Sequence, residues 1–422
     1  MTILQFGEGN FLRGFADRMI EGMNRSSGFD GHVQIVQPRE KESDAARLLN
    51  ARGGRYHVVL RGIEQGTAVE RIEEIRCVRG VLNPKRDWAA IETVARDPDL
   101  RIVLSNTTEA GIVYRPNADT FPAKVARLLN VRFKAGLPGL RFLPCELIER
   151  NGETLRDCVL RYVEDPALRR WIESDCIFHN TLVDQIVSGR PDPESAERYA
   201  RLLGERDDTL VCAEPFHFWA IENGQDLESE CPLQRAGFHV VYPDDLTPYR
   251  TRKVRFLNGA HTALAMAGHL AGFTCVDELT RDAVFGAKLR RLLFDEIFPT
   301  VPLPDDEKRA YAESVLERFA NPYAHHRLLS IALNSVSKWR VRILPTLLDY
   351  LEQFGRLPDE LTASLGALIR FYRSGAAVDN PEILAFFKTG PAVEAILAQT
   401  DFWGMDLNTL PGMTEKVGAR CG

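Results

Sequence analysis

Three polar side chains at short spacing in the second half of the chain have the types needed for proton transfer on an alcohol. They are Lys253, Asn258 and His261, in the segment KVRFLNGAH. On an α-helix of 3.6 residues per turn they would lie at about 0°, 140° and 80° around the axis. The spacing therefore predicts one shared polar face, with Arg255 pointing away from it.

Oxidation of a secondary alcohol without a metal is the chemistry that would use this face. A desolvated lysine near other cations has a lowered pKa, so it can take the hydroxyl proton near neutral pH. An asparagine N–H would stabilise the developing alkoxide by about 3 kcal/mol if the magnitudes of oxyanion sites apply, and a histidine would hold a neighbouring hydroxyl. The spacing alone also fits a solvated helix face, so these three residues do not by themselves indicate an active site.

A glycine-rich turn near the N-terminus has the composition of a phosphate-binding loop. The strand expected over residues 2–6 leads into FGEGNFLRG and a helix. Gly7 and Gly9 would bring backbone N–H groups close to a pyrophosphate with no Cβ in the way. Leu12 stands where the generic fingerprint has its third glycine, so an ordinary glycine turn with a surface arginine remains an alternative for this motif. The cofactor-binding residues predicted here are Gly7, Gly9, Asn10, Phe11 and Arg13, the last as a cationic partner for phosphate.

Polar side chains follow two further strands of the same expected sheet. The second strand ends in Gln37, which can bond a ribose hydroxyl, whereas Arg39 can accommodate a 2′-phosphate, so the choice between NAD and NADP stays open. A later strand runs into Ser105, Asn106 and Thr107. Ligands bind at the carboxyl edge of a parallel sheet, which predicts that these residues line the cofactor crevice. A capped turn is the alternative.

The apolar periodicities divide the chain into two domains. Short β-branched runs alternate with amphipathic helices in the first half, which predicts an α/β, Rossmann-like doubly wound domain with a hairpin inserted near residues 56–78. Further strands are expected over 140–144 and 209–213, and a first helix over 12–24. After the turn-rich segment PDDLTPY the pattern is helical. We expect a dinucleotide-binding domain over 1–245 and an all-helical substrate and catalytic domain over 246–422, with helices at 251–271, 282–298, 305–319, 326–338, 344–354, 358–372 and 382–399.

Composition narrows the classes of partner. Apolar residues make up 45% and charged residues 27% of the 422-residue chain, as in ordinary globular proteins. The net charge of −6 comes without a basic stripe, so no nucleic-acid partner is expected, and no apolar run approaches the ~18 residues of a membrane helix. The eight cysteines stand singly, which gives no zinc motif. We expect no metal, reduced thiols in the cytoplasm, and a small-molecule partner; no interface or oligomeric state is legible.

Taken together, these segments resemble the mannitol dehydrogenase family, the polyol-specific long-chain dehydrogenases. The family pattern Lys-x-x-x-x-Asn-x-x-His matches Lys253, Asn258 and His261, and Gly-x-Gly-x-Phe-x-Arg matches the N-terminal turn. The segments NTLVDQI at 180–186 and EPFHFW at 214–219 recur as well. Similar stretches run from residue 4 to about 373.

The resemblance implies an NAD(H)-dependent, metal-independent oxidoreductase that interconverts tagaturonate and altronate, a sugar-acid pair. It implies that Lys253 is the general acid and base, that Asn180 and Asn258 form the oxyanion site, and that His261 holds a substrate hydroxyl. A hexonate carboxylate needs a fixed cation, and the resemblance leaves open which residue supplies it. The substrate-binding residues expected on this basis are Asp184, Lys338 and Arg340, with Arg252 and Arg255 as competing cations.

Two departures from the family pattern bear on substrate choice. Gln185 stands where many relatives carry arginine, and Arg250 stands where some carry an acidic residue. Both concern proton escape and sugar specificity rather than the reaction class. The alternatives are a sibling activity on mannonate and fructuronate, on mannitol or on mannitol 1-phosphate, and a dinucleotide-binding sensor without turnover.

Overall fold

The computed structural model describes residues 1–421, apart from the side chain of Glu109, and divides them into two compact units. The first unit contains residues 1–61 and 69–246, and the second contains residues 62–68 and the chain from residue 247 onward. The change of unit falls inside the turn-rich segment at 243–249. None of the helices in the described range is long and apolar enough to cross a lipid bilayer.

A parallel sheet forms the centre of the first unit, in the strand order β5-β2-β1-β6-β7-β8. Phe6 pairs in register with Val36 on one side and with Ser105 on the other, so three neighbouring strands end at the same edge. This edge carries the predicted cofactor residues. The strands are β1 (Thr2–Phe6), β2 (His32–Val36), β5 (Val78–Leu82), β6 (Leu100–Ser105), β7 (Arg141–Pro144) and β8 (Ile177–Phe178).

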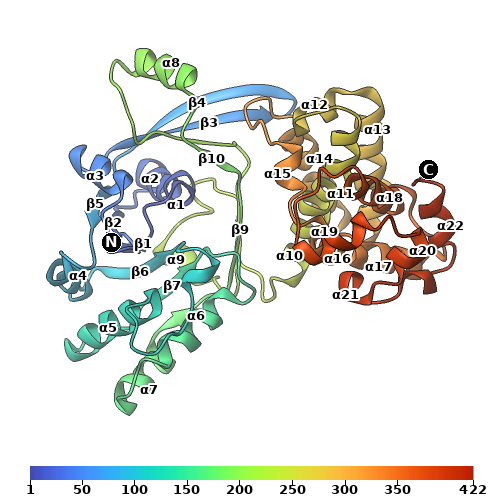
Figure 1. Ribbon diagram of the computed structural model, residues 1–422. Coiled ribbons are helices and arrows are strands. Elements are labelled where there is room, and N and C mark those ends of the chain that lie inside the picture. The colour runs from blue at the N-terminus through green and yellow to red at the C-terminus, as the bar shows by residue number, and fades with distance from the viewer. Residues whose placement is uncertain (422) are drawn as a thin grey trace. The chain divides into compact units, whose positions relative to one another are not determined.

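Helices cover both faces of this sheet, which confirms the doubly wound architecture (Figure 1). Alternate residues of β1 face opposite cores: Ile3 packs with α1 and α2, whereas Leu4 and Phe6 pack with α4 to α7. The predicted helix over 12–24 begins earlier and bends at Phe15. The helices are α1 (Asn10–Gly14), α2 (Ala16–Ser26), α3 (Asp44–Ala51), α4 (Trp88–Ala95), α5 (Phe121–Lys134), α6 (Asn151–Leu160), α7 (Pro166–Asp175), α8 (Pro193–Leu203) and α9 (Leu227–Glu230), with a 3-10 turn η1 (Glu109–Gly111).

Two smaller sheets complete the first unit, and one of them corrects a prediction. The strand expected over 209–213 does not join the large sheet: β11 pairs with β3 and β10, because sheet membership is set by tertiary pairing rather than by local sequence. The predicted hairpin is present as β3 and β4, joined by Gln65 and Gly66, which both have positive φ as a tight primed turn requires. One of these sheets contains β3 (Tyr56–Glu64), β4 (Thr67–Ile75), β10 (Val187–Gly189) and β11 (Val211–Ala213). The other contains β9 (Thr181–Asp184), β12 (Phe218–Ile221) and β13 (Val240–Val241).

The second unit is helical, as predicted. Its α-helices are α10 (Thr247–Arg252), α11 (Ala260–Leu270), α12 (Val276–Arg281), α13 (Ala283–Arg291), α14 (Asp305–Phe319), α15 (Leu328–Ile331), α16 (Ser335–Arg342), α17 (Leu344–Phe354), α18 (Asp359–Arg373), α19 (Pro381–Lys388), α20 (Val393–Leu397), α21 (Thr400–Trp403) and α22 (Met413–Gly418). Two π-helical segments, η2 (Lys253–Gly259) and η3 (Leu292–Ile297), and two 3-10 turns, η4 (Phe298–Thr300) and η5 (Leu407–Thr409), lie between them.

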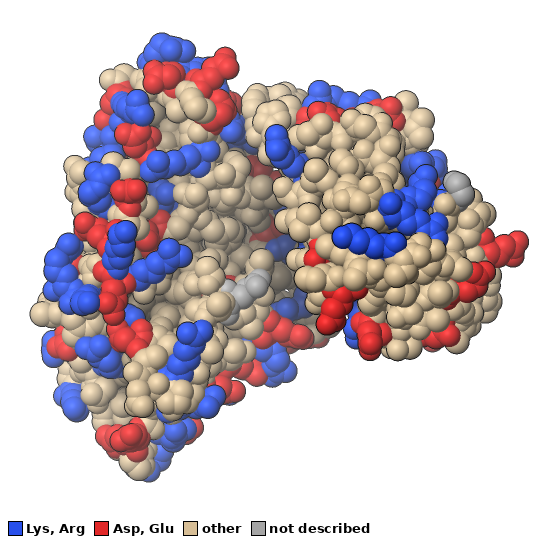
Figure 2. All heavy atoms as spheres, in the orientation of Figure 1, with Lys and Arg blue, Asp and Glu red and all other residues tan. Residues whose placement is uncertain are grey.

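Two of the predicted helices in this unit are broken. The element expected over 326–338 becomes α15 and α16, separated at Asn334, whose φ of +53° is left-handed and is tolerated by asparagine. The element expected over 382–399 becomes α19 and α20, with Gly390 at positive φ between them. The unit is held by buried aromatic packing, in which the rings of Trp339 and Trp403 meet at 5.4 Å. On the face of the molecule in Figure 2, acidic and basic side chains are interspersed over the first unit.

Candidate active site

The glycine turn after β1 leaves open space at a helix N-terminus. Gly7 has φ +122°, and a Cβ at this position would lie 2.9 Å from the Asn106 carbonyl oxygen, so only glycine fits. Gly9 caps α1 with an ordinary φ of −65°, and a Cβ there would meet no protein atom within 4 Å. The protein therefore does not itself need glycine at position 9. The open space at Gly9 leaves room for a ligand to approach the backbone.

Arg13 supports this turn from inside the protein. Its buried guanidinium donates from Nε to the Glu8 carbonyl at 3.1 Å and from Nη2 to Asn10 Oδ1 at 2.7 Å, and Nη1 donates to the Thr209 carbonyl. Burial lowers the pKa of this arginine. These hydrogen bonds show that Arg13 holds the turn in place. This structural role does not require a bound phosphate. Phe11, on the same helix, stacks on Phe15 at 5.1 Å.

A buried carboxyl group lies beneath the turn and was not predicted. Asp17 Oδ2 lies 3.0 Å from the Tyr56 hydroxyl and 3.5 Å from Gln5 Nε2, and Gln5 also donates to the Gly7 carbonyl at 3.0 Å. Burial raises the pKa of Asp17 to about 7, against the hydrogen bonds from Tyr56 and Gln5 and the charge of Arg13. The available signal in the sequence is Gln5, a polar residue within the apolar strand TILQF.

The ends of β2 and β6 also carry polar groups. Gln37 is buried, donates through Nε2 to the Lys41 carbonyl at 2.9 Å, and has a buried Oε1 atom without a hydrogen-bond partner among residues 1–421. Arg39 is exposed. The unpaired Oε1 atom of Gln37 can accept a hydrogen bond from a ribose hydroxyl. Together with the open space at Gly9 it forms a site that fits a dinucleotide, which we call the dinucleotide cradle.

Glu146, a second unpredicted carboxyl group, organises the loop after β6. It accepts hydrogen bonds from Ser105 Oγ at 3.0 Å, from Thr107 N at 2.9 Å and from Thr107 Oγ1 at 3.1 Å. Burial raises its pKa. Asn106 donates to the Cys145 carbonyl at 3.0 Å. The predicted residues Ser105, Asn106 and Thr107 therefore lie beside the glycine turn, in a loop held by these hydrogen bonds.

Asn180 and Asp184, the two predicted substrate-site residues of the first unit, bracket β9. Asn180 Nδ2 donates to Glu153 Oε1 at 3.1 Å and to Glu222 Oε2 at 2.7 Å, so both of its N–H groups are directed at carboxylates. Asp184 is buried and pairs in register with Phe218 of β12. An oxyanion role for Asn180 would require one of these hydrogen bonds to break.

The Lys–Asn–His segment is not the regular α-helix that was predicted. Residues Lys253–Gly259 form the π-helical segment η2, in which hydrogen bonds run from residue i to i+5. Lys253 and Asn258 are five residues apart, so the π geometry places them one above the other on the same side, instead of about 140° apart. Arg255 forms an ion pair with Asp349 and donates to the Thr300 carbonyl. Single π turns occur frequently at functional sites.

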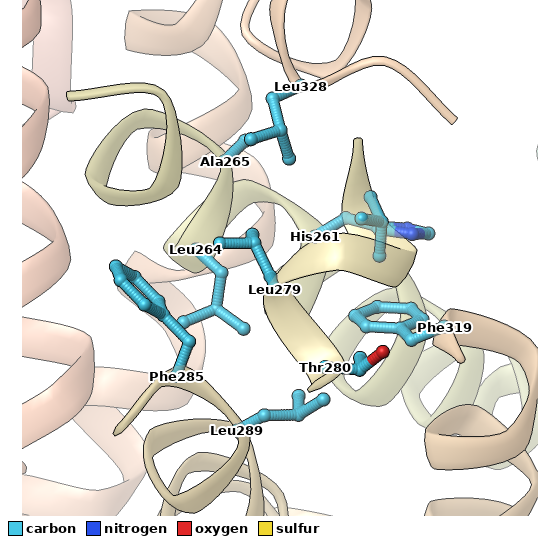
Figure 3. A pocket seen from close by; sticks show the side chains of 10 residues that line it. His261, Leu264, Ala265, Leu279, Thr280, Phe285, Leu289, Phe319 and Leu328 are labelled. Carbon is cyan, nitrogen blue, oxygen red and sulfur yellow. The ribbon is translucent and has the colours of Figure 1, made fainter. Parts of the chain in front are cut away.

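His261 is held as a neutral, buried ring. It stacks on Phe319 with ring centroids 4.0 Å apart and meets the edge of His326 at 4.9 Å. Burial lowers its pKa well below the usual range, and the charges of His326, Arg318 and Arg342 add to this effect. His261 also lines an apolar cavity whose volume is about 10 Å³, which is too small for a sugar. Figure 3 shows the side chains that line this cavity.

The two cations expected to hold a carboxylate lie on different sides of α16. Lys338 Nζ donates to the Ile331 carbonyl at 2.8 Å and is half-buried. Arg340 is exposed, lies against Gly404, and donates to the Asp401 carbonyl. Within the described residues, no group of three or more His, Cys, Asp or Glu side chains is arranged to hold a metal ion.

The class of protein follows from the residues at the glycine turn of the first unit and those of the Lys–Asn–His segment of the second. A Rossmann unit with a dinucleotide cradle, together with a helical unit that carries lysine, asparagine and neutral histidine, defines an oxidoreductase of CH–OH groups that uses a nicotinamide dinucleotide. Family models agree: the Mannitol dehydrogenase Rossmann domain matches residues 1–234, and the Mannitol dehydrogenase C-terminal domain matches residues 245–421. The chain belongs to the mannitol dehydrogenase family.

Individual proteins resemble the chain over nearly its whole length. An altronate oxidoreductase of Bacillus subtilis is 40% identical over 98% of this chain and 91% of its own length. A substrate-free D-sorbitol dehydrogenase structure has a TM-score of 0.81 at 25% identity and covers 99% of this chain and 91% of its own. Mannitol 2-dehydrogenase of Pseudomonas fluorescens, in complex with NAD and D-mannitol, shares the fold with a TM-score of 0.74 at 22% identity, over 100% of this chain and 91% of its own.

Proposed function

We propose that this chain interconverts tagaturonate and altronate with NAD(H). The proposal rests mainly on the sequence similarity to altronate oxidoreductases, which extends over nearly the whole chain and reaches 40% identity for the Bacillus subtilis enzyme. The Lys253, Asn258 and His261 set and the dinucleotide cradle supply the chemistry that such a reaction needs. The substrate is therefore a small sugar acid.

The bound nicotinamide ring would accept a hydride from the alcohol carbon or donate one to the ketone carbon. Gly7, Gly9 and Gln37 would hold the dinucleotide. Lys253 takes the proton of the altronate hydroxyl, and in the reverse direction it returns a proton to the ketone oxygen. Proton transfer by a positioned side chain contributes about 10²–10⁴-fold. No metal takes part in this scheme.

Asn258 is the stronger of the two proposed oxyanion donors. It lies on the same side of η2 as Lys253, and its amide is not tied to a carboxylate among residues 1–421. Asn180 already donates to two carboxylates. His261 is neutral, so it can hold a substrate hydroxyl without competing with Lys253 for the proton.

NAD is the proposed cofactor rather than NADP because Gln37 is buried beside the cradle with a free acceptor atom, whereas Arg39 is exposed. An acceptor suits the 2′-hydroxyl of NAD and repels the 2′-phosphate of NADP. We place the enzyme in the cytoplasm, since all the cysteines among residues 1–421 are free thiols, as a reducing compartment allows.

The test is a panel of substrates and cofactors. Oxidation of NADH and of NADPH is followed with tagaturonate, fructuronate and fructose, each over a range of concentrations. We expect the highest kcat/KM with tagaturonate and NADH. A higher kcat/KM with fructuronate or fructose would assign a sibling activity, and tight NADH binding without turnover of any sugar would assign a sensor.

A further inference from the structure

A cluster of buried side chains lies beneath the glycine turn, with Asp17 at its centre. Asp17 Oδ2 is 3.0 Å from the hydroxyl of Tyr56 on β3, and the Asp17 backbone carbonyl accepts a hydrogen bond from Cys77 Sγ at 3.4 Å. The guanidinium of Arg13 on α1 lies over the Tyr56 ring, 5.3 Å from its centroid. One turn further along α2, Glu21 accepts from the backbone N–H of Cys77 at 2.8 Å. All five side chains are buried, so solvent screens the charge of Asp17 poorly.

The hydrogen bonds around Tyr56 are complete when Asp17 carries a proton. The Tyr56 hydroxyl is 3.0 Å from Asp17 Oδ2 and also 3.0 Å from the Arg13 carbonyl oxygen. A phenol has a single proton to donate, and a carbonyl oxygen only accepts. Both bonds form if Tyr56 donates to the Arg13 carbonyl and a protonated Asp17 donates to Tyr56. An ionised Asp17 would lose one of these bonds, and its buried Oδ1 atom has no hydrogen-bond partner among residues 1–421.

Among Asp17, Tyr56 and Cys77, the carboxyl group is the one that changes charge near neutral pH. Burial raises the pKa of Asp17 to about 7, against the hydrogen bonds from Tyr56 and Gln5 and the charge of Arg13. Burial also raises the pKa of the Tyr56 phenol and of the Cys77 thiol well above their ordinary values, so both groups stay neutral. The charge beneath the turn therefore depends on whether Asp17 holds its proton.

Gln5 connects this cluster to the glycine turn. Its Nε2 atom donates to the Gly7 carbonyl at 3.0 Å and lies 3.5 Å from Asp17 Oδ2. Gly9, two residues further along the turn, borders the open space of the dinucleotide cradle. The pyrophosphate of a dinucleotide is a dianion, so a carboxylate buried beneath the same turn would repel it, and this repulsion is strong in the low dielectric of a protein interior. A neutral Asp17 does not oppose the bound dianion.

We propose that the dinucleotide binds most tightly when Asp17 is protonated, so that NADH binding and proton binding by Asp17 are coupled. Asp17 is then a positioning residue, because it acts on the cofactor through Gln5 and the turn. The inference rests on one part of the proposed function, the placement of the cofactor at Gly7 and Gly9. It is independent of the identity of the sugar.

The test is the dissociation constant of NADH from pH 6 to pH 8.5, measured by fluorescence titration. If the protonated form binds NADH about tenfold more tightly, the dissociation constant of the wild type should rise roughly 5- to 10-fold over this range. Asp17→Asn, whose amide stays neutral, should bind NADH about equally well at both ends. Asp157→Asn, at a site on α6 that is 68% exposed, is the matched control and should keep the pH dependence of the wild type. An equal rise in Asp17→Asn and the wild type, or no rise in either, would overturn the proposal.

Calorimetry on the wild type tests the same coupling without a variant. NADH is titrated in MOPS and in Tris, whose heats of ionisation differ, so the difference between the measured heats gives the number of protons taken up. We expect an uptake of about half a proton per NADH near pH 7.5 and little uptake at pH 6. Binding without proton uptake at pH 7.5 would contradict the proposal.

Gly9→Ala separates a failure of this inference from a failure of the proposed cofactor site. Wild-type NADH affinity in Gly9→Ala would show that the cofactor binds elsewhere, and the site and the inference would fail together. Weaker binding by Gly9→Ala, combined with pH-independent NADH binding by the wild type, would leave the site in place and exclude the coupling to Asp17. Since no sugar is present in these measurements, a failure to reduce tagaturonate would not affect them.

Discussion

Asp17 is a single buried side chain that can make the glycine turn after β1 sensitive to pH. Its carboxyl group is fully buried, and through Gln5 it is linked to the Gly7 carbonyl. The unfolded carboxyl has its ordinary pKa of 3.8, whereas the folded one has a pKa of about 7. Between about pH 4 and pH 7 the folded protein therefore holds a proton that the unfolded chain has lost. The Asp17 contribution to stability is largest below pH 4 and decreases as pH rises to 7.

Asp17→Asn should remove this decrease, because the amide does not ionise. Relative to the wild type, the free energy of unfolding of the variant should rise by roughly 2–3 kcal/mol between pH 5 and pH 8, at 1.36 kcal/mol per pKa unit. Urea unfolding at several pH values measures this difference. Asp157→Asn on α6, whose side chain is 68% exposed, is the control and should give no such rise. Parallel curves for Asp17→Asn and the wild type would show that the buried carboxyl does not titrate in this range.

At the scale of elements, the two glycines in the turn between β1 and α1 have different roles. The fold requires Gly7, whereas only the proposed ligand would require Gly9. Gly7 is required by its φ of +122° and by the Asn106 carbonyl, whereas Gly9 has an ordinary φ and open space around it. Alanine substitutions at the two positions should therefore have different effects on stability and similar effects on cofactor affinity.

Gly7→Ala should lower the free energy of unfolding by about 1–3 kcal/mol through backbone strain, and it should weaken NADH binding. Gly9→Ala should melt like the wild type and yet bind NADH at least 10-fold more weakly, because its methyl group would occupy the approach of the pyrophosphate. Thermal unfolding and NADH fluorescence titration measure the two properties. A Gly9→Ala protein with wild-type NADH affinity would show that the cofactor does not bind at this turn.

The sequence predicts the elements that local patterns specify and misses those that depend on packing. The strand, turn and helix around Gly7 follow from apolar periodicity and glycine, and the structure confirms them. Asp17 looks like an ordinary acidic residue in the first turn of a helix, and only the packing of β3 places Tyr56 over it. The π turn at Lys253 has no local signal apart from the five-residue spacing to Asn258. Asn334 breaks a helix that apolar periodicity alone predicts as continuous.

At the scale of the whole molecule, the residues of the proposed reaction are divided between the two units. The dinucleotide cradle, Asn180 and Asp184 belong to the first, whereas Lys253, Asn258, His261 and the expected substrate-binding Lys338 and Arg340 belong to the second. We therefore expect that cofactor binding and proton transfer can be impaired separately, since the residues proposed for each lie within one unit. Loss of the lysine amine should leave the cradle intact.

The most direct measurement is steady-state reduction of tagaturonate by NADH with Lys253→Ala. We predict that kcat falls about 10²–10⁴-fold, while the dissociation constant of NADH stays within about twofold of the wild type. Lys388→Ala, which removes an exposed lysine at the end of α19, should keep full activity. A Lys253→Ala protein that retains most of the wild-type kcat would contradict the assignment of Lys253 as the acid and base.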